Sequence, residues 1–457
     1  MKILLINAIN PHVEIETRYP QLGLGYLVNY IREKLGHSAH EFKVVDNNVE
    51  ETLDTFKPDL IGISSLSPNY SIAKKYAALC KKRNLPVIVG GMHISLLPIS
   101  FSRDMDVGVL FEGEATMAEL VQLYDKTGRF DLGDLSNING ILYWDNDQLH
   151  STKPRPLIDK LDSIPIPARE LLNVKGTHLS MFTSRGCPYR CIFCASSRFW
   201  ATTRFSSASY VTKEIKELYY NYGAKLISFY DDLFIANKKR LFNLLNDLAT
   251  EGILGKVRFS CSARADLVND QTVKLLKDLG VVSVFLGLES GHQRTLNYLK
   301  CDTTTVENNT NAVKLLNQNG ITTNATFIIG SPAETENEIM ATYNFIKTIS
   351  LRNFNVYIMT PLPGTPIWSE AVEKGLIGED FDNWSVLDAV HFLKYHNEAI
   401  VVSQEVHRER LRKIYKMFQR LRYWTYFKNA YRHPFTKDVP RMAWALAKEK
   451  FVEMMRR

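Results

Sequence analysis

Two stretches of the chain alternate short apolar runs with helical patterns, and this alternation constrains the fold more than any other feature. In the first stretch, apolar runs occur at Lys2–Ala8, Phe42–Asp46, Leu60–Ser65, Pro86–Gly91 and Val107–Phe111, with helical spacing at Gly23–Leu35, Ser71–Arg83 and Met117–Asp125. Strands that alternate with helices form right-handed βαβ units. The first stretch therefore predicts a doubly wound parallel sheet, whose ligands would bind beyond the carboxyl ends of the strands.

The second alternation begins near Leu179. Its apolar runs are Leu179–Ser184, Leu226–Tyr230, Val257–Ser262, Val282–Leu288, Asn324–Ile329 and Phe354–Met359, and its helical patterns are Ala208–Tyr222, Lys238–Thr250, Asp270–Leu279, Thr305–Asn319 and Glu334–Ile349. Six strands with helices between them predict a partial parallel barrel. Active sites of parallel barrels lie at the carboxyl ends of the strands.

The segment between the two alternations is predicted to be an extended connector. It contains three glycines and then the run Ile164-Pro-Ile-Pro167, and prolines at this spacing disfavour helix. The expected domains are residues 1–126, a connector at 127–172, the barrel at 173–370 and a mostly helical region at 371–457. The α/β class applies to both main domains.

The chain of 457 residues has no apolar segment long enough to span a membrane, which would need roughly 18 consecutive apolar residues. Its start, MKILLINA, resembles a buried first strand more than a signal peptide, because no small-residue cleavage site follows. We therefore expect a cytoplasmic protein. Disulfides are not expected in that reducing compartment.

Three of the six cysteines, Cys187, Cys191 and Cys194, lie within eight residues, directly after the first strand of the second alternation. Thiolates are the usual ligands of iron–sulfur clusters. Three cysteines leave one iron of a four-iron cluster open to a small molecule. A zinc knuckle is the alternative, but no second cysteine pair exists, and the nearest histidine, His178, precedes the strand.

The sequence FTSRGCPYRCIFCASS, with Phe193 before the last cysteine of CxxxCxxC, resembles the signature of radical S-adenosylmethionine (SAM) enzymes. The resemblance implies a partial (β/α)6 barrel and a [4Fe–4S] cluster held by Cys187, Cys191 and Cys194. It also implies that SAM binds the open iron, with Phe193 nearby. Reductive cleavage of SAM would give a 5′-deoxyadenosyl radical that takes hydrogen from the substrate.

Three later residues match places where this family contacts SAM. Arg264 would pair with the SAM carboxylate or, alternatively, with Asp266. Glu289 ends the fourth strand and would contact SAM, and Ile328 would lie against adenine or simply be part of a buried strand. The pair Asp231-Asp232 would bind substrate or cap the turn after the second strand.

The first stretch, taken as a set of strand-end motifs, resembles the Rossmann-like cobalamin-binding domain that precedes some radical SAM barrels. The resemblance implies cobalamin contacts at Leu22, Gly23, Ser64, Ser65, Gly90, Gly91, His93, Gly113 and Glu114. The Asp-x-His-x-x-Gly motif is absent, so no lower cobalt ligand is assigned. His93 would either contact the corrin or stabilise its own loop.

This pair of cofactors implies methylation of an unactivated carbon of a small-molecule or lipid substrate, with methylcobalamin as the methyl donor. A cyclisation, ring contraction or carbon–carbon coupling without methyl transfer is the first alternative, and a non-enzymatic cobalamin or metal sensor is the second. Transfer-RNA methylthiolation is disfavoured, because the similar enzymes of that reaction carry a second cysteine trio in the N-terminal domain. Here the first domain has Cys80 as its single cysteine. Auxiliary clusters are disfavoured because no cysteine follows Cys301.

The net charge is +7, and basic residues concentrate after His407. There the segment Arg420–Lys428 contains both basic and aromatic residues. Such a segment suits an anionic substrate or an anionic membrane surface, or it is a solvated helical face. We expect an external electron donor such as flavodoxin or ferredoxin, and no nucleic acid. Peripheral membrane contact through the basic tail is a further hypothesis.

Overall fold

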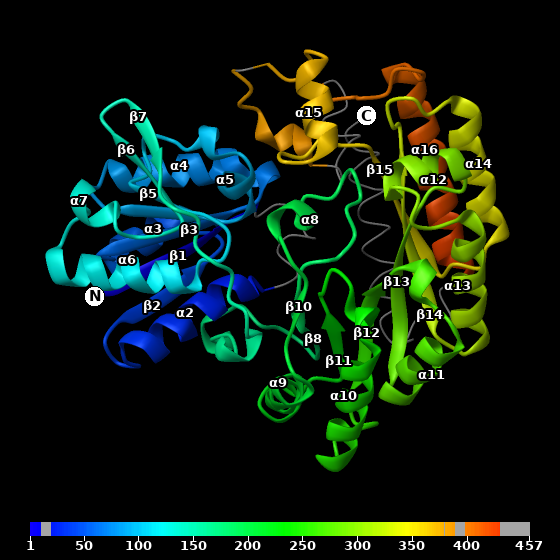
Figure 1. Cartoon of the computed structure of the whole chain (residues 1–457), viewed down its shortest axis with the longest axis horizontal. Helices are drawn as coiled ribbons and strands as arrows, with labels where there is room; N and C mark the ends of the chain where they lie inside the picture. Colours follow the sequence, from blue (N-terminus) through cyan, green and yellow to red (C-terminus); the bar gives the residue numbers. More distant parts are fainter. Residues whose placement is uncertain (11–19, 379, 389–397, 430–457) are drawn as a thin grey trace. The chain divides into compact units, whose positions relative to one another are not determined.

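The structure is a computed structural model that describes residues 1–10, 20–378, 380–388 and 398–429. Contacts divide the chain into two compact units: Met1–Lys225 with Thr360–Ile400, and Leu226–Met359 with Val401–Arg457. Each unit is built around a β-sheet with helices (Figure 1). The three-cysteine segment belongs to the same unit as the first sheet.

The sheet of the first unit has the strand order β2-β1-β3-β4-β5-β6-β7. Its strands are β1 (Lys2–Ala8), β2 (Glu41–Val45), β3 (Leu60–Ser65), β4 (Val87–Gly90), β5 (Val107–Val109), β6 (Ile141–Asp145) and β7 (Gln148–Ser151). The strands β1 to β5 are parallel, with Ile3 opposite both Phe42 and Leu60. The parallel sheet expected from the first alternation is confirmed.

The connector supplies two strands to this sheet, and these strands were not expected from the sequence. β6 pairs antiparallel with β5, and β7 pairs antiparallel with β6. The turn between them places Asn146 at φ 50°, a left-handed conformation that asparagine tolerates well. Ile141, Leu142 and Tyr143 are buried, so burial on the sheet outweighed the turn-rich composition of the segment.

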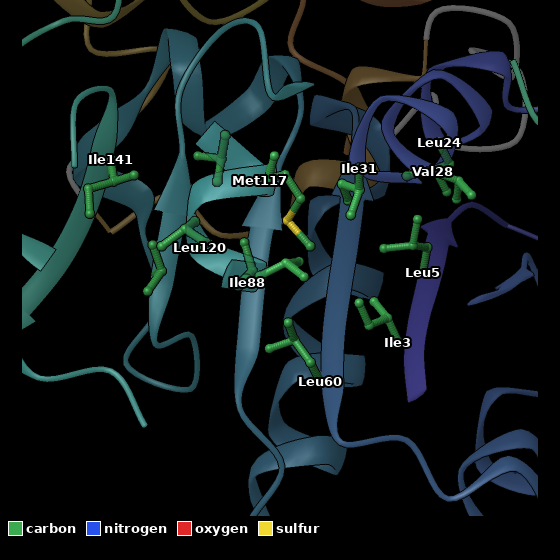
Figure 2. Close-up of a cluster of buried hydrophobic side chains, with 14 of the residues drawn as sticks. Ile3, Leu5, Leu24, Val28, Ile31, Leu60, Ile88, Met117, Leu120 and Ile141 are labelled. Carbon is green, nitrogen blue, oxygen red and sulfur yellow. The ribbon is translucent and has the colours of Figure 1, made fainter. Parts of the chain in front are cut away.

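Helices cover both faces of this sheet, α2 and α6 on one face and α4 on the other (Figure 1). The helices are α2 (Leu22–Leu35), α3 (Val49–Phe56), α4 (Tyr70–Lys81), α5 (Met92–Leu96), α6 (Glu114–Thr127) and α7 (Leu132–Leu135). Figure 2 shows Ile3 and Leu5 of β1 facing apolar side chains of α2 and α6. Burial of such side chains contributes roughly 1.5–3 kcal/mol each, which is the main stabilisation of a sheet of this kind.

The remainder of the first unit follows the sheet along the chain. It contains the short helix η4 (Arg169–Leu171), β8 (His178–Met181), β9 (Ser184–Arg185), α8 (Ser196–Phe199), β10 (Arg204–Phe205), α9 (Ala208–Tyr220), α15 (Pro366–Glu373) and η7 (Trp384–Leu387). The proline run before η4 packs on α2: Asn29 Nδ2 donates to Ile166 O at 2.7 Å, and Ala168 N donates to Gly25 O at 3.0 Å.

In the second unit, parallel strands follow the order β15-β14-β13-β12-β11. They are β11 (Leu226–Phe229), β12 (Arg258–Ala263), β13 (Val281–Glu289), β14 (Thr322–Ile329) and β15 (Asn353–Ile358), and the helices are α10 (Lys238–Thr250), α11 (Asp270–Leu279), α12 (Gln293–Lys300), α13 (Val306–Gln318), α14 (Glu336–Thr348) and α16 (Arg408–Lys428). With β8, all six expected strands are present, although β8 ends three residues earlier than expected.

Polar side chains mark where several of these helices begin. Asn237, Asn269, Thr305 and Thr335 each accept a backbone N–H bond at a helix N-terminus, the usual role of these residue types. The region predicted to be mostly helical, residues 371–457, contains α16, and its residues 379, 389–397 and 430–457 lie outside the described part. Among the residues that the structure describes, no helix is long and apolar enough to cross a membrane.

Candidate functional site

The carboxyl ends of β3 and β4 lie so close together that one position there requires glycine. Gly91, directly after β4, has φ 107°, and a Cβ at this position would overlap the backbone of Ser65 at the end of β3. Ser65 is buried, and its Oγ donates to Leu66 O at 3.0 Å. The predicted cobalamin contacts Ser64, Ser65, Gly90 and Gly91 are thus together at one sheet edge.

Two large apolar side chains stand exposed beside these strand ends. Leu66, after β3, is 50% exposed, and Phe111, after β5, is 37% exposed at φ 59°. A bulky residue in the left-handed region is strained, and such strain persists where a site requires it. Exposed apolar side chains beside a backbone edge fit a large, flat ligand such as a corrin.

His93 is fully buried, and both of its ring nitrogens have partners. Its Nδ1 lies 3.0 Å from Ser67 Oγ, and its Nε2 lies 3.0 Å from Ser100 Oγ. The ring lies against Tyr70, with the ring centroids 3.9 Å apart, and burial lowers the pKa of His93 to about 3. A cobalt ligand needs an available ring nitrogen, so these contacts favour loop stabilisation over ligation.

The predicted contacts at the start of α2 differ from each other in exposure. Leu22 is buried against Tyr26, Leu161, Ile164 and Leu172, which join the helix to the connector. Gly23 is exposed, and a Cβ there would lie near no atom except one of Gln21. The backbone of Gly23 is therefore open to a ligand, whereas the Leu22 side chain is occupied by packing.

Glu114, another predicted cobalamin contact, forms an ion pair with Arg185 of β9. Its neighbour Glu112 bonds Arg185 at 2.6 Å and Arg204 at 2.8 Å. Burial raises the pKa of Glu112, but the two guanidinium groups outweigh burial and the net pKa is lowered. The arginines Arg185 and Arg204 were missed in the sequence, although they bracket the cysteine motif there.

The three cysteines lie in the loop between β9 and β10. Cys191 is buried, Cys187 and Cys194 are half-buried, and none of the six cysteines forms a disulfide. Phe193, half-buried, stands next to Cys194. Thiolate donors suit iron–sulfur clusters, so the donor set fits the predicted cofactor.

In the described part of the chain, no three His, Cys, Asp or Glu side chains form a group that could hold one metal ion. A cubane cluster does not require such a group, because its cysteines bind different irons rather than one point.

Arg190 stabilises the cysteine loop through hydrogen bonds to backbone carbonyls of the same loop. Arg190 donates to Ser197 O and, at 3.1 Å, to Ala201 O. Within the same loop, Ser197 Oγ donates to Cys194 O at 2.9 Å. Because these bonds join the segment between the cysteines to α8 and to the chain just after it, Arg190 holds the loop in one shape. An arginine between two cysteines was the sequence signal for this role, and it was overlooked.

The predicted SAM contacts of the second unit lie at the carboxyl ends of its strands. Arg264, after β12, bonds Asp266 at 3.0 Å and Thr303 Oγ1 at 2.8 Å. The pair with Asp266 is one of the two alternatives for Arg264, and the other is a pair with the SAM carboxylate. Both can form together, because a guanidinium has five N–H donors.

Glu289 ends β13 at φ 62° and is buried, with Lys300 Nζ 3.3 Å from its Oε1. Burial raises the pKa of Glu289, although Lys300 opposes this effect. Ile328 is buried in β14. Asp231, after β11, is buried, and its carboxylate lies 3.7 Å from the guanidinium of Arg240. This arrangement is consistent with both expectations for Asp231, an ion pair that stabilises the turn and a contact with substrate.

Two family models match the chain. The radical SAM superfamily matches residues 181–346, and the B12 binding domain matches residues 12–121. Among curated proteins, an uncharacterised methyltransferase from Pyrococcus horikoshii is 32% identical over 86% of this chain and 89% of its own. The anaerobic magnesium-protoporphyrin IX monomethyl ester cyclase of Cereibacter sphaeroides is 26% identical over 78% of this chain and 61% of its own.

Among solved structures, the radical SAM methyltransferase TsrM from Kitasatospora setae, with cobalamin and a [4Fe–4S] cluster bound, has a TM-score of 0.67 at 17% identity. The match covers 82% of this chain and 75% of TsrM. A further structure of TsrM holds tryptophan substrate and the SAM analogue aza-SAM. The likeness confirms the expected fold, a Rossmann-like sheet followed by a partial barrel.

Proposed function

Since the chain belongs to the radical SAM superfamily and carries a B12-binding domain ahead of its barrel, we propose that it is a cobalamin-dependent radical SAM C-methyltransferase. Its substrate would be an unactivated carbon of a small molecule or lipid. The observation that carries this proposal is the three-cysteine loop, which lies in one compact unit with the cofactor edge of the first sheet. The methyltransferase names of the relatives support the reaction type.

In this proposal, Cys187, Cys191 and Cys194 hold a [4Fe–4S] cluster, and Arg190 keeps their loop in shape. Cobalamin lies on the edge formed by Ser64, Ser65, Gly90, Gly91 and the backbone of Gly23, against Leu66 and Phe111. When bound, the cluster and SAM supply hydrogen abstraction, and cobalamin supplies the methyl group. Phe193, Arg264, Glu289 and Ile328 would bind and orient SAM.

The finer expectations on partners belong to the same proposal. A flavodoxin or ferredoxin would deliver the electron, and the substrate would be a small molecule, as tryptophan is for TsrM. A lipid substrate and a peripheral membrane contact rest on the basic and aromatic side chains of α16, where Trp424 is 75% exposed. The expected location is the cytoplasm.

Product analysis tests the reaction type. The full chain, reconstituted anaerobically with iron, sulfide and cobalamin, would be reduced with titanium(III) citrate and given SAM with a deuterated methyl group. We expect S-adenosylhomocysteine, deuterated methylcobalamin and 5′-deoxyadenosine, measured by mass spectrometry. In the proposed reaction cobalamin would receive the methyl group of SAM before the substrate does, so the assay needs no identified substrate.

Two outcomes would contradict the proposal in different ways. 5′-Deoxyadenosine without S-adenosylhomocysteine or methylcobalamin would indicate radical chemistry without methyl transfer. Neither product from a chain with a full complement of iron would indicate a sensor rather than an enzyme. Heat-inactivated holoprotein controls for reaction of SAM with free cobalamin.

An anaerobic cyclisation is the second candidate function, and one observation favours it. The Cereibacter sphaeroides relative that matches over most of this chain is a cyclase. Radical generation and cobalamin binding would be common to both reactions. The product assay separates them, because a cyclase would not consume the methyl group of SAM.

A further inference from the structure

A two-stranded hairpin closes the cysteine loop at its base. β9 and β10 pair antiparallel, with Arg185 directly opposite Arg204. Gly186, the first residue beyond β9, has φ 88°, and a Cβ there would overlap Thr202 O and approach Trp200 Cβ. The two ends of the loop are thus in close contact, so whatever fixes Arg185 and Arg204 also fixes the cysteines between them.

One carboxylate of the first domain contacts both strands of this hairpin. Glu112 Oε1 accepts from Arg185 Nη1 at 2.6 Å, and Glu112 Oε2 accepts from Arg204 Nη1 at 2.8 Å. The same Oε2 accepts from Ile158 N at 2.7 Å, and Ile158 O accepts from Arg204 at 2.6 Å. Glu112 therefore joins the hairpin, the connector and the end of the B12-binding sheet at a single point.

The charges in this group are balanced and withdrawn from water. Two arginines face two carboxylates, since Arg185 also pairs with Glu114, and all four side chains are at most 15% exposed. The Trp200 ring lies 5.6 Å from the Arg185 guanidinium and 5.5 Å from that of Arg204. Removing one charge from such a group leaves its partner buried and uncompensated, which is strongly unfavourable.

An aromatic contact joins the same two parts of the chain. Phe111, next to Glu112, packs on Phe199 of α8, with ring centroids 5.6 Å apart. The helix α8 follows directly after Cys194, and the short helix α5 of the first domain also lies against it. The residues after β5 thus contact the cysteine loop both at its hairpin and at α8.

We infer that Glu112, assisted by Glu114, is a positioning residue that fixes the cysteine loop onto the B12-binding domain. The inference rests on the proposed function in one respect, that the loop holds the cluster. It assigns the carboxylate of Glu114 to the loop instead of to cobalamin. Retention of the cluster would then depend on two glutamates that lie far from the cysteines in the sequence.

Three variants, each of which replaces one glutamate with neutral glutamine, test this inference in the full chain. Glu112→Gln removes the charge that faces both arginines, and Glu114→Gln removes the charge that faces Arg185 alone. Glu119→Gln is the matched control, because Glu119 pairs with Arg155 on the same domain and does not touch the hairpin. We expect the effects to decrease from Glu112→Gln through Glu114→Gln to Glu119→Gln.

The first measurement needs no cluster. Trypsin would be added to the cluster-free chain, and cleavage after Arg190 and Arg198 would be followed by mass spectrometry. For Glu112→Gln we expect cleavage about tenfold faster, because proteolysis follows the population of the open loop. Melting curves identify a variant that has not folded. If Glu112→Gln does not fold, the cleavage rate of Glu114→Gln decides whether the glutamates hold the loop.

The second measurement uses the reconstituted protein. Iron loss to a chelator should be roughly tenfold faster in Glu112→Gln, the size of effect usual for residues that orient metal ligands. The EPR spectrum of the reduced cluster should also change. Neither should change in Glu119→Gln.

Two results would overturn the inference. One is that the folded variants Glu112→Gln and Glu114→Gln are cleaved by trypsin, and lose iron, at the same rates as the wild type. The other is weaker cobalamin binding by Glu114→Gln with an unchanged loop, which would return Glu114 to the cofactor. If the unmutated chain accepts no cluster, the proposed function fails, while the cleavage rates still decide whether the glutamates hold the loop.

Discussion

At the scale of single residues, neighbouring groups set the protonation of buried carboxylates in opposite directions. Glu112 faces two guanidinium groups, and its pKa is lowered despite burial. Glu334 is buried next to backbone N–H groups: it accepts from Gly330 N at 2.7 Å and from Ser331 N at 3.1 Å. Here burial outweighs the hydrogen bonds and raises the pKa of Glu334 to about 7.

The raised pKa of Glu334 predicts a pH-dependent stability. The folded chain binds this proton more tightly than the unfolded chain, so the stabilisation is present below about pH 4.5 and is lost as the pH rises to about 7. A shift of this size corresponds to about 3 kcal/mol. We expect the stability advantage of Glu334→Gln over wild type to increase from pH 5 to pH 7.5, measured by urea unfolding of the cofactor-free chain.

Other carboxylates also make the stability depend on pH, so the difference in unfolding free energy between the two proteins is the quantity to compare. Glu338, for example, has its pKa lowered to about 2 by its hydrogen bond with Arg294 and contributes with the opposite sign in acid. A difference between wild type and Glu334→Gln that does not vary with pH would show that Glu334 is ionised throughout.

At the scale of elements, a buried ion pair attaches the connector to α9. Arg169 of η4 pairs with Glu214 of α9, and both side chains are at most 1% exposed. Arg169 also donates to Ser180 O of β8 at 3.2 Å. Three elements therefore meet at one guanidinium. The IPIPARELL sequence identified the connector, but the partner of its arginine lies 45 residues further on.

Removal of one charge from this pair should be costly. Arg169→Met leaves Glu214 buried and uncompensated, and such a change destabilises by roughly 3–5 kcal/mol. We expect a lower urea midpoint for Arg169→Met than for the double variant Arg169→Met/Glu214→Leu, in which no charge remains buried.

The nearby pair of Arg32 and Glu170 provides the control. It joins α2 to the same connector at 2.6 Å but is more exposed, so Arg32→Met should cost about 1 kcal/mol or less. Equal losses in Arg169→Met and Arg32→Met would contradict the importance of burial.

At the scale of the whole molecule, the proposed cofactor sites depend on different local features. Cobalamin would need strand ends of the first sheet, whereas the cluster would need thiolates in the loop after β9. Both regions belong to one compact unit, yet the ion pairs at the base of the loop join Arg185 and Arg204 to glutamates of the first domain. Loss of one cofactor should therefore leave the site of the other in place.

Cys191→Ala tests this independence. Without one of its three thiolates the chain should retain little iron and form no 5′-deoxyadenosine from SAM. Cobalamin affinity, measured by absorbance titration, should stay within about twofold of wild type, a difference below 0.5 kcal/mol. Cys80→Ala, which removes a buried thiol of α4, should change neither property.

A large loss of cobalamin affinity in Cys191→Ala would show that the two sites are coupled. Full iron content in the same variant would instead remove Cys191 from the cluster ligands. The two results are independent, because iron and cobalamin are measured separately.

The sequence by itself determined the order of the elements and predicted the chemistry of the cysteine loop. Strand and helix follow from periodicities of two and 3.6 residues, which are local. For this reason β1, β3, α10 and α11 begin and end at the expected residues. The spacing of the cysteines is local too. The hairpin of β6 and β7 was missed because its stabilisation comes from pairing with β5.

Only the tertiary structure decided what the side chains at the strand ends do. Glu112 and Arg185 are 73 residues apart in sequence, and His93 has its ring nitrogens occupied by Ser67 and Ser100. Burial and partner geometry depend on contacts between distant segments, which no local pattern contains. For this reason the sequence predicted a cofactor edge as a region, whereas the roles of Glu114 and His93 within it depend on how the chain folds back on itself.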